Sequence, residues 1–420
     1  MAVTSESVVD VCARSRAASL RLGGIDPAIR DRALLRAAAL LRSRTAEIIE
    51  ANATDIEAAR GQGIEGALLD RLSLDAERVE AMAVGVEEIV ALPDPLAEVV
   101  RRETLRSGIE MKQVRVPIGV IAIVYEARPN VTIDAAALCL KSGNAVILRG
   151  SSSAAASNAV LAGIVAEAAA EAGMPSGVVE LVAGGGRGEL AELAQQKDLV
   201  DLIIPRGGEG LKRALEEVTE IPVLYAASGN CHVYVHAEAD QAMARAIAVN
   251  AKVQRPGVCN SAETLLVDSS IAAQFLPDAL AELRSAGVEL VGDERARELA
   301  GVEVGGATTE DWDTEYLDLK LTVGVVDGVD AAIEHINRHG SGHSEAIVTG
   351  SAEAADAFTR RVDAACVYVN ASTRFTDGFE FGLGAEIGNS TQKLHARGPI
   401  GLLELTTTKY VLRGDGQVRG

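Results

Sequence analysis

The residue best suited to nucleophilic chemistry is Cys259, which lies in the run VQRPGVCNSAE (residues 253–263). This run places the thiol in a turn that contains glycine, just before a segment typical of a strand. Lys252 and Arg255 are close in sequence, and neighbouring cations lower a thiol's pKa from roughly 8.5 and so increase the reactive thiolate fraction. Cys259 is therefore either a small residue at the end of a strand or a nucleophile, and this run alone leaves both interpretations open. The other cysteines occur in apolar contexts and are expected in the core: Cys12, Cys139, Cys231 and Cys366.

Two other runs have residues that suit a phosphorylated ligand. In NAVILRGSSSAAASNAV (144–160), a strand-like segment ends at Arg149, and Ser151 and Ser152 precede a helix-like segment. Backbone N–H groups at a helix start and an arginine fork both bind phosphate. In LIIPRGGEGL (202–211), the glycines of the turn Arg206-Gly207-Gly208 allow close approach of a ligand to the backbone. Each run has a simpler explanation as well: a helix cap with a solvated arginine, or a turn that requires glycine.

An amide donor follows the first strongly apolar strand. Asn130, in VYEARPNVTIDAA (124–136), stands near an expected helix start, where it would either cap the helix or donate to developing negative charge. No GxGxxG run follows this strand, so an ordinary Rossmann dinucleotide site is not indicated. His335 and His339 are one helical turn apart, but glycines end that helix and the glutamate of HExxH is missing, so we expect no metal site.

The elements that must position these residues follow from hydrophobic patterning. Residues 5–92 have apolar residues at helical spacing, and Asp26 before Pro27 predicts a helix start. Residues 98–116 are typical of a β-hairpin that turns at Ser107-Gly108. Short apolar runs then alternate with helical segments, from GVIAIVY (119–125) to PVLYAA (222–227) and again over about 231–370. This alternation predicts buried parallel sheets covered by helices, with ligands beyond the carboxyl ends of the strands.

Composition sets outer limits on function. A chain of 420 residues suggests two or three domains. A net charge of −20 argues against nucleic acid and anionic membranes as partners. No apolar run approaches the ~18 residues of a membrane span, and the amino terminus is not typical of a signal peptide. Five scattered cysteines form no disulfide framework, so we expect a reducing, cytoplasmic location.

Together the motifs identify a family. The chain resembles the γ-glutamyl phosphate reductases (glutamate-5-semialdehyde dehydrogenases), a branch of the aldehyde dehydrogenase superfamily, over most of its length beyond residue 110. The resemblance is carried by VPIGVIAIVYEARPNVTIDAAALCLKSGNAVILRGSSSA, QRPGVCNSAETLLV, DTEYLDLKLTVGVVD, HINRHGSGHSEAIVT and STRFTDGFEFGLGAEIGNSTQKLHARGPIGLLELTT.

The resemblance implies an α/β, aldehyde dehydrogenase-like fold with two parallel-sheet domains and a small β oligomerisation lobe. Residues 1–99 and 119–228 would bind the cofactor, with a return of the chain near 371–398. Residues 229–370 would form the catalytic domain that carries Cys259. Residues 100–118 and 399–420 would form the oligomerisation lobe, which makes the protein at least a dimer.

The resemblance also implies roles for the catalytic residues. Cys259 matches the thiol nucleophile, and Asn130 matches the asparagine that forms an oxyanion hole with the cysteine's backbone N–H. Lys252, Arg255 and Arg374 are candidates to bind the substrate, by their charge and motif position only.

Cofactor contacts are implied in the same way. The family uses NADPH, and Arg149 stands where many aldehyde dehydrogenases have a lysine at the adenine ribose, which is compatible with a 2′-phosphate. Ser151, Ser152 and the turn Arg206-Gly207-Gly208 would line the same cofactor. Glu315 matches the glutamate that holds the nicotinamide ribose.

One departure from the superfamily favours reduction. Aldehyde-oxidising members have a glutamate shortly after the last cofactor-domain strand, which activates water to hydrolyse a thioester. Here that stretch is YAASGNCHVYV (225–235), with no acid before Glu238. A reductase that starts from an acyl phosphate has no use for such a base, because hydrolysis of the thioester would waste its substrate.

We therefore expect NADPH-dependent reduction of L-glutamyl 5-phosphate to L-glutamate 5-semialdehyde and phosphate through a thioester on Cys259, the second step of proline biosynthesis. Two alternatives remain open. One is another superfamily member, either aldehyde-oxidising or coenzyme A-acylating, and the other is a non-catalytic oligomeric scaffold. A transient contact with glutamate 5-kinase, which makes the labile acyl phosphate, is also left open.

Overall fold

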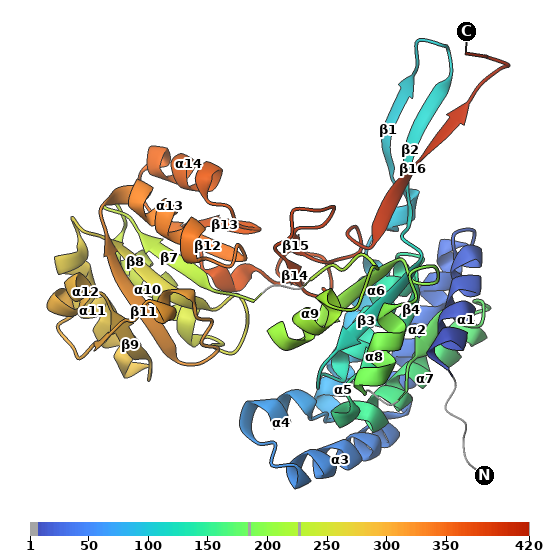
Figure 1. The fold of residues 1–420 in the computed structure, drawn as a ribbon, viewed down its shortest axis with the longest axis horizontal. Coiled ribbons are helices and arrows are strands. Elements are labelled where there is room, and N and C mark those ends of the chain that lie inside the picture. Colours follow the sequence, from blue (N-terminus) through green and yellow to red (C-terminus); the bar gives the residue numbers. More distant parts are fainter. Residues whose placement is uncertain (1–6, 184–185, 226–227, 420) are drawn as a thin grey trace. The chain divides into compact units, whose positions relative to one another are not determined.

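The computed structural model describes residues 7–183, 186–225 and 228–419 (Figure 1). The chain divides into two compact units. Unit 1 comprises residues 1–226, 382–388 and 400–420, and unit 2 comprises residues 227–381 and 389–399. Each unit contains a parallel sheet covered by helices, which confirms the fold class predicted from the alternating pattern.

The sheet of unit 1 has the strand order β5-β4-β3-β6, and all neighbours are parallel. Its strands are β3 (Val120–Tyr125), β4 (Ala145–Gly150), β5 (Val179–Leu181) and β6 (Leu202–Arg206). Every residue of β3 and β4 is buried, which explains why these strands have continuous apolar sequences rather than alternating ones. The run PVLYAA contributes one isolated bridge, Val223 to Ile203, and its last two residues lie outside the described part of the chain.

Helices cover both this sheet and one another. They are α1 (Val8–Leu22), α2 (Pro27–Ser43), α3 (Thr45–Gly61), α4 (Gly66–Leu72), α5 (Ala76–Ala91), α6 (Asn130–Lys141), α7 (Ala155–Glu171), α8 (Arg187–Ala194) and α9 (Glu209–Glu216), with 3-10 turns η1 (Pro95–Ala97) and η2 (Ser152–Ala154). The predicted start of α2 is confirmed, since Asp26 accepts a hydrogen bond from Ala28 N and Pro27 is the first helical residue. In the described part of the chain, the segment Ser152–Glu171 is long and apolar enough to cross a membrane, but half of that stretch is buried and α7 packs on α2 and α3, as expected of a core helix.

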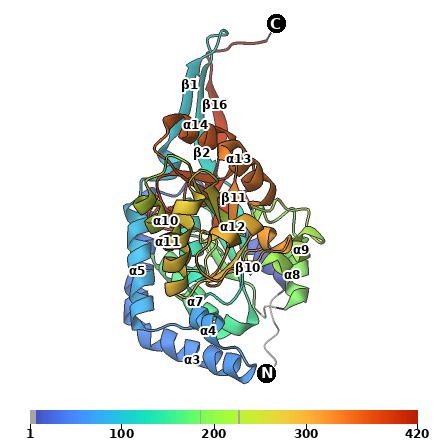
Figure 2. The ribbon, with the colours of Figure 1, turned by 90° about the vertical axis from the view of Figure 1, so that its left-hand side faces the viewer.

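Unit 1 also carries a three-stranded antiparallel ribbon, of order β1-β2-β16. Its strands are β1 (Val99–Thr104), β2 (Glu110–Pro117) and β16 (Thr406–Arg413). The predicted hairpin is confirmed, and Gly108 adopts the positive φ of 83° that its turn requires. The ribbon extends away from the helices of unit 1 (Figure 1, Figure 2). Its role in oligomerisation stays a prediction.

The sheet of unit 2 has the order β10-β9-β11-β8-β7-β12-β13, again with parallel neighbours. Its strands are β7 (Cys231–Val235), β8 (Ala262–Asp268), β9 (Glu289–Gly292), β10 (Gly305–Gly306), β11 (Lys320–Val326), β12 (Ser344–Val348) and β13 (Cys366–Val369). The helices are α10 (Gln241–Val253), α11 (Ala272–Ser285), α12 (Glu294–Leu299), α13 (Gly328–His339) and α14 (Ala352–Arg361), with 3-10 turns η3 (Glu310–Asp313) and η4 (Thr373–Phe375). Successive side chains of β7 lie on opposite faces of the sheet. Val233 packs with residues of α10 and α11, and Tyr234 packs with residues of α13 and α14. A short pair, β14 (Asn389–Ser390) and β15 (Gly398–Pro399), completes the unit.

The carboxy-terminal return differs from the predicted range of 371–398. Residues 371–381 and 389–399 pack within unit 2, and the chain returns to unit 1 at 382–388 and from residue 400 onward. Hydrogen bonds hold the first of these segments: Thr373 Oγ1 donates to Asn260 O at 2.7 Å, and Asn260 Nδ2 donates to Thr376 O at 2.8 Å. The second is held by Arg397, which pairs with Asp363 at 2.8 Å. The predicted range came from the family resemblance, and side-chain contacts of this kind, which decide where each segment packs, cannot be derived from motif positions.

Candidate active site

The predicted nucleophile lies at the amino-terminal edge of the unit 2 sheet. Cys259 belongs to the loop that joins α10 to β8, and β7 begins at Cys231 on the same edge. Cys231 is fully buried and its Sγ donates to Cys259 O at 3.2 Å, whereas Cys259 is partly exposed. The general expectation of a site beyond the carboxyl ends of the strands therefore does not hold for this thiol in unit 2.

Gly229 connects Cys259 to Glu315. A Cβ atom at position 229 would lie 1.4 Å from Cys259 O, so only glycine fits there. The backbone N–H of the same glycine donates to Glu315 Oε1 at 2.7 Å. The structure thus brings the predicted nucleophile and the predicted ribose-binding carboxylate together around one residue of unit 2.

Two arginines lie near the thiol. Arg374, in η4, donates from Nε to Gln254 Oε1 at 2.8 Å, and its carbonyl accepts from Asn260 Nδ2 at 3.4 Å. Burial lowers the pKa of the Arg374 guanidinium, and repulsion from Arg255 lowers it further, while Asp377 and Cys259 act in the opposite direction. Gln254 and Asn260 stand on either side of Cys259 in the sequence, so these two hydrogen bonds keep Arg374 beside the loop that carries the thiol. Positive charge of this kind favours the thiolate form of a cysteine.

Lys252 is placed differently from these two arginines. It is fully buried, and its Nζ donates to Glu263 Oε2 at 2.5 Å, with Glu263 fully buried as well. Burial lowers the pKa of Lys252 and raises the pKa of Glu263 to about 7, and the attraction between the two groups opposes both shifts. A buried, neutralised ammonium offers no free charge, so this placement argues against the predicted contact of Lys252 with substrate.

Asn130, in unit 1, does not cap its helix. Pro129 occupies the N-cap position of α6, and no side-chain cap bond is present there among the described residues. The Asn130 side chain is exposed, and its Nδ2 donates to Asp134 Oδ2 at 3.1 Å, one helical turn later. Burial raises the pKa of Asp134 to about 6, and the hydrogen bond from Asn130 and the charge of Arg206 oppose this shift. The helix-cap interpretation of Asn130 is therefore wrong.

The predicted cofactor residues Arg149 and Arg206 share one edge of the unit 1 sheet. Arg149 pairs with Val124 across β3 and β4, and Arg206 pairs with Tyr125 across β3 and β6. Arg149 is buried and its Nη2 donates to Gly186 O at 2.6 Å. Arg206 Nε is buried with no hydrogen-bond partner among residues 7–183, 186–225 and 228–419. This edge is the carboxyl end of the strands, as predicted for unit 1.

The serine run beside Arg149 is organised differently from the prediction. Ser151 Oγ and Ser153 Oγ are 2.6 Å apart, and Ser152 begins η2. Two amides in the first turn of α7, those of Ala156 and Ser157, donate to the carboxylate of Asp55 at 3.1 and 2.8 Å. The expectation of free N–H groups for a phosphate at this helix start is wrong, because a carboxylate from α3 already occupies it.

The glycines of the turn 206–208 leave space for the side chain of Glu126. A Cβ atom on Gly207 would lie 2.8 Å from the carboxyl carbon of Glu126, and Gly208 N donates to Glu126 Oε2 at 3.3 Å. The close approach predicted from these glycines is therefore made by Glu126. The sequence patterns did not single out Glu126, Asp134 or Glu263. Only Asp134 had a local signal, its spacing of four residues from Asn130 within one helix.

The histidines of α13 pack into a small aromatic group. The rings of His335 and His339 are 4.6 Å apart, and Trp312 meets His335 edge-on at 5.0 Å. Burial lowers the pKa of His335 to about 3, so this ring is neutral. Within the described residues, no group of His, Cys, Asp and Glu has the arrangement of a metal site.

Comparison with known proteins gives a consistent result along the whole chain. The model of the aldehyde dehydrogenase family matches residues 1–305. A γ-glutamyl phosphate reductase of Syntrophomonas wolfei is 52% identical over 414 residues, with 99% of each chain covered. One from Thermobifida fusca is 55% identical over 97% of this chain and 98% of its own. The crystal structure of γ-glutamyl phosphate reductase from Thermotoga maritima is similar with a TM-score of 0.96 and 44% identity, covering 99% of this chain and all of that one.

Proposed function

The chain belongs to the aldehyde dehydrogenase family, in its γ-glutamyl phosphate reductase branch, and on this premise we propose that it reduces L-glutamyl 5-phosphate to L-glutamate 5-semialdehyde and phosphate with NADPH. The proposal makes it the second enzyme of proline biosynthesis. The observation that carries it is the placement of a partly exposed cysteine, Cys259, in a loop that Arg374 contacts at Gln254 and Asn260.

In the proposed mechanism, Cys259 attacks the acyl carbon of the substrate and phosphate leaves. Arg255 and Arg374 carry the charge needed to hold the acyl phosphate and to stabilise the departing phosphate. Covalent catalysis divides one difficult reduction into two easier steps. Asn130 and the backbone N–H of Cys259 donate to the oxyanion that forms at the acyl carbon, and a donor of this type is worth about 10²–10³ in rate.

The residues at the unit 1 edge fit a nicotinamide dinucleotide phosphate. Arg149 and Arg206 lie on the same edge, and the buried Nε of Arg206 is a donor without a partner among the described residues. The amides of Ala156 and Ser157 in the first turn of α7 are already bonded to Asp55, so we expect arginine and serine side chains to bind the phosphate groups of the cofactor. Glu315, held by Gly229 N, is proposed to bind the nicotinamide ribose. A bound NADPH supplies the hydride that converts the thioester to the aldehyde.

The stretch 225–235 supports reduction over hydrolysis. It contains no acidic residue, so it offers no base to activate water against the thioester. The acyl group on Cys259 would therefore persist until hydride or phosphate reaches it.

A reverse-direction assay tests the function. The purified chain is given the semialdehyde, phosphate and NADP⁺, and NADPH formation is followed for the wild type, Cys259→Ser, and Cys366→Ser as a control for a buried cysteine of unit 2. We expect phosphate-dependent NADPH formation in the wild type and the control, and none above background in Cys259→Ser. NADPH formation that needs no phosphate and yields free glutamate would indicate an aldehyde oxidiser. A requirement for coenzyme A would indicate an acylating dehydrogenase, and activity in Cys259→Ser would refute the thiol mechanism.

We also propose that the β1-β2-β16 ribbon joins copies of this chain. Val99, Val100, Tyr410 and Leu412 are exposed apolar side chains on its strands. β1 and β16 are the edge strands of this ribbon, and edge strands favour pairing with another chain. A mass near that of one chain in light scattering at micromolar concentration would contradict this proposal.

A further inference from the structure

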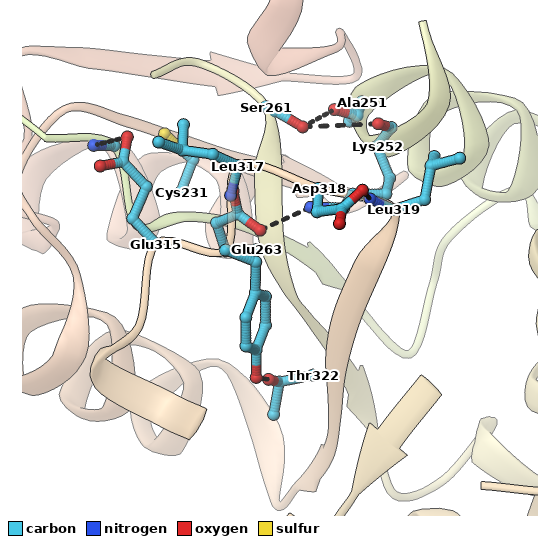
Figure 3. Close-up of polar contacts among 12 residues, drawn as sticks. Cys231, Ala251, Lys252, Ser261, Glu263, Glu315, Leu317, Asp318, Leu319 and Thr322 are labelled. Atoms are coloured by element: carbon cyan, nitrogen blue, oxygen red, sulfur yellow. Dashed lines mark hydrogen bonds and ion pairs between the residues drawn. The ribbon is translucent and has the colours of Figure 1, made fainter. Parts of the chain in front are cut away.

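The buried ion pair of Lys252 and Glu263 has no role in the mechanism above. Both side chains have 0% exposure, and Nζ and Oε2 are 2.5 Å apart (Figure 3). Taking two charges out of water costs several kcal/mol per ion, and a well-packed apolar pair of similar size is often equally stable or more stable. A gain in folding stability therefore does not explain why this buried pair is present. The other contacts of the two side chains indicate a different role.

The pair closes the base of the loop that carries Cys259. Lys252 is in the last turn of α10 and Glu263 is the second residue of β8, so the two residues flank the loop. Ser261 Oγ donates to Ala251 O at 3.2 Å and to Lys252 O at 3.4 Å, which ties the same two elements together. These contacts therefore hold the two ends of the loop that carries Cys259 at a fixed distance from each other.

The second carboxylate oxygen of Glu263 reaches the turn that follows Glu315. Oε1 accepts a hydrogen bond from Leu317 N at 3.4 Å. Leu317 has a φ of 55°, which is unfavourable for a leucine, so this turn needs support from its surroundings. Tyr316 adds to that support, because its ring faces Lys252 Nζ at 5.9 Å and its hydroxyl lies 2.7 Å from Thr322 Oγ1.

One side-chain network therefore joins the two segments that supply Cys259 and Glu315. The network runs from Lys252 through Glu263 to the backbone of Leu317, next but one to Glu315. We propose that the Lys252–Glu263 pair is a positioning device that fixes Glu315 relative to Cys259. The inference rests on the proposed function for the identity of the ligand, and on the contacts above for the geometry.

Two neutral double variants separate positioning from stability. Lys252→Met with Glu263→Met replaces the pair by apolar side chains and removes the acceptor of Leu317 N. Lys252→Met with Glu263→Gln also removes both charges but keeps an oxygen for Leu317 N. The control is Arg295→Met with Asp327→Asn, which removes a 2.7 Å ion pair elsewhere in unit 2. The readouts are the melting temperature, NADPH affinity by fluorescence titration, and amide hydrogen exchange of residues 314–319.

We expect both Lys252 and Glu263 double variants to melt within a few degrees of the wild type. The Met/Met protein should bind NADPH about 10-fold more weakly, as expected for the loss of one well-placed charged hydrogen bond, and should exchange residues 314–319 faster. The Met/Gln protein and the control should match the wild type in both respects. Equal NADPH affinity and equal exchange in Met/Met and Met/Gln would overturn the proposal.

A further variant covers the case in which the Met/Met protein does not fold. Glu263→Asp keeps the negative charge beside Lys252 but withdraws the carboxylate from Leu317, so NADPH should again bind about 10-fold more weakly. Unchanged affinity and unchanged exchange in this variant would overturn the positioning role. If the wild-type chain does not bind NADPH, the proposed function fails, and the exchange of residues 314–319 still decides whether the pair positions this turn.

Discussion

Asp134 offers a test in which stability and activity should change in opposite directions. Its carboxylate accepts a hydrogen bond from Asn130 Nδ2 at 3.1 Å, and burial raises its pKa to about 6. An ionised carboxylate is only an acceptor, so it forces the NH₂ side of the Asn130 amide to face it, which leaves the second N–H for the oxyanion contact proposed above. The variant Asp134→Asn removes this restriction, because an amide partner accepts either orientation.

The stability effect follows from the pKa. A shift from 3.8 to about 6 means that ionising Asp134 in the folded state costs about 3 kcal/mol relative to the unfolded chain. The side chain keeps some solvent contact, so we expect Asp134→Asn to be more stable than the wild type by about 1–2 kcal/mol at pH 7. Because the folded-state pKa is the higher one, wild-type stability rises as the pH falls from about 6 to about 4. The difference between the two proteins should vanish below pH 4.

The rate effect has the opposite sign. If the two amide orientations of Asn130 become equally populated, the rate falls about 2-fold, and complete loss of the donor would lower it about 10²–10³-fold. We expect a kcat at least about 2-fold below that of the wild type with little change in KM, since the proposed donor acts on charge that develops in the transition state. Protonation of Asp134 removes the same restriction, so the ratio of wild-type to variant kcat should fall from at least about 2 at pH 7.5 toward 1 below pH 5.

The assay is phosphate-dependent NADPH formation from the semialdehyde between pH 5 and 8, together with urea unfolding at the same pH values. Asp70→Asn is the matched control, because Asp70 pairs with Arg78 at 2.6 Å on an exposed surface of unit 1. A kcat ratio near 1 at pH 7.5, or a ratio independent of pH, would refute the orienting role of Asp134. A loss of stability at pH 7 would refute the electrostatic part of the reasoning.

Three further predictions concern the same site. Gly229→Ala places a Cβ atom 1.4 Å from Cys259 O, so it should destabilise the protein by about 3 kcal/mol and slow labelling of Cys259 by iodoacetamide; a normal melting temperature would contradict the packing described here. Arg149→Ala should weaken NADPH binding about 10-fold and NADH binding much less, as isothermal titration would measure, and an equal loss for both would exclude a contact with the 2′-phosphate. Arg255→Gln and Arg374→Gln should each raise the KM for phosphate in the reverse assay about 10-fold, and an unchanged KM in both variants would remove them from the substrate site.

The sheets were predictable from sequence because burial on both faces leaves a continuous apolar run. The strands β3 and β4 are buried at every residue and occur in the sequence as VIAIVY and AVILRG. The hairpin of β1 and β2 was predictable for a different reason, since Ser107-Gly108 marks its turn between two charged, alternating segments.

The polar contacts of the site were not predictable from local sequence. Asp55 fills the amino terminus of α7 from another helix, so the serines of 151–153 gave a misleading signal of free amides. Lys252 was expected to bind the substrate, but its charge is paired with that of Glu263, and charged residues are almost never fully buried unless they are paired in this way. Pro129 takes the cap position that Asn130 was expected to fill, which leaves the Asn130 amide to Asp134.

The most direct test of the thiol mechanism is mass spectrometry of the acyl enzyme. The wild-type chain is incubated with the semialdehyde and NADP⁺ without phosphate, quenched in acid and digested, and the peptide containing residues 253–263 is analysed. We predict a glutamyl adduct on Cys259 that is stable in buffer and that disappears on addition of phosphate, with release of the acyl phosphate. Absence of the adduct, or its equally fast loss as free glutamate with and without phosphate, would contradict a reductase built around this thiol.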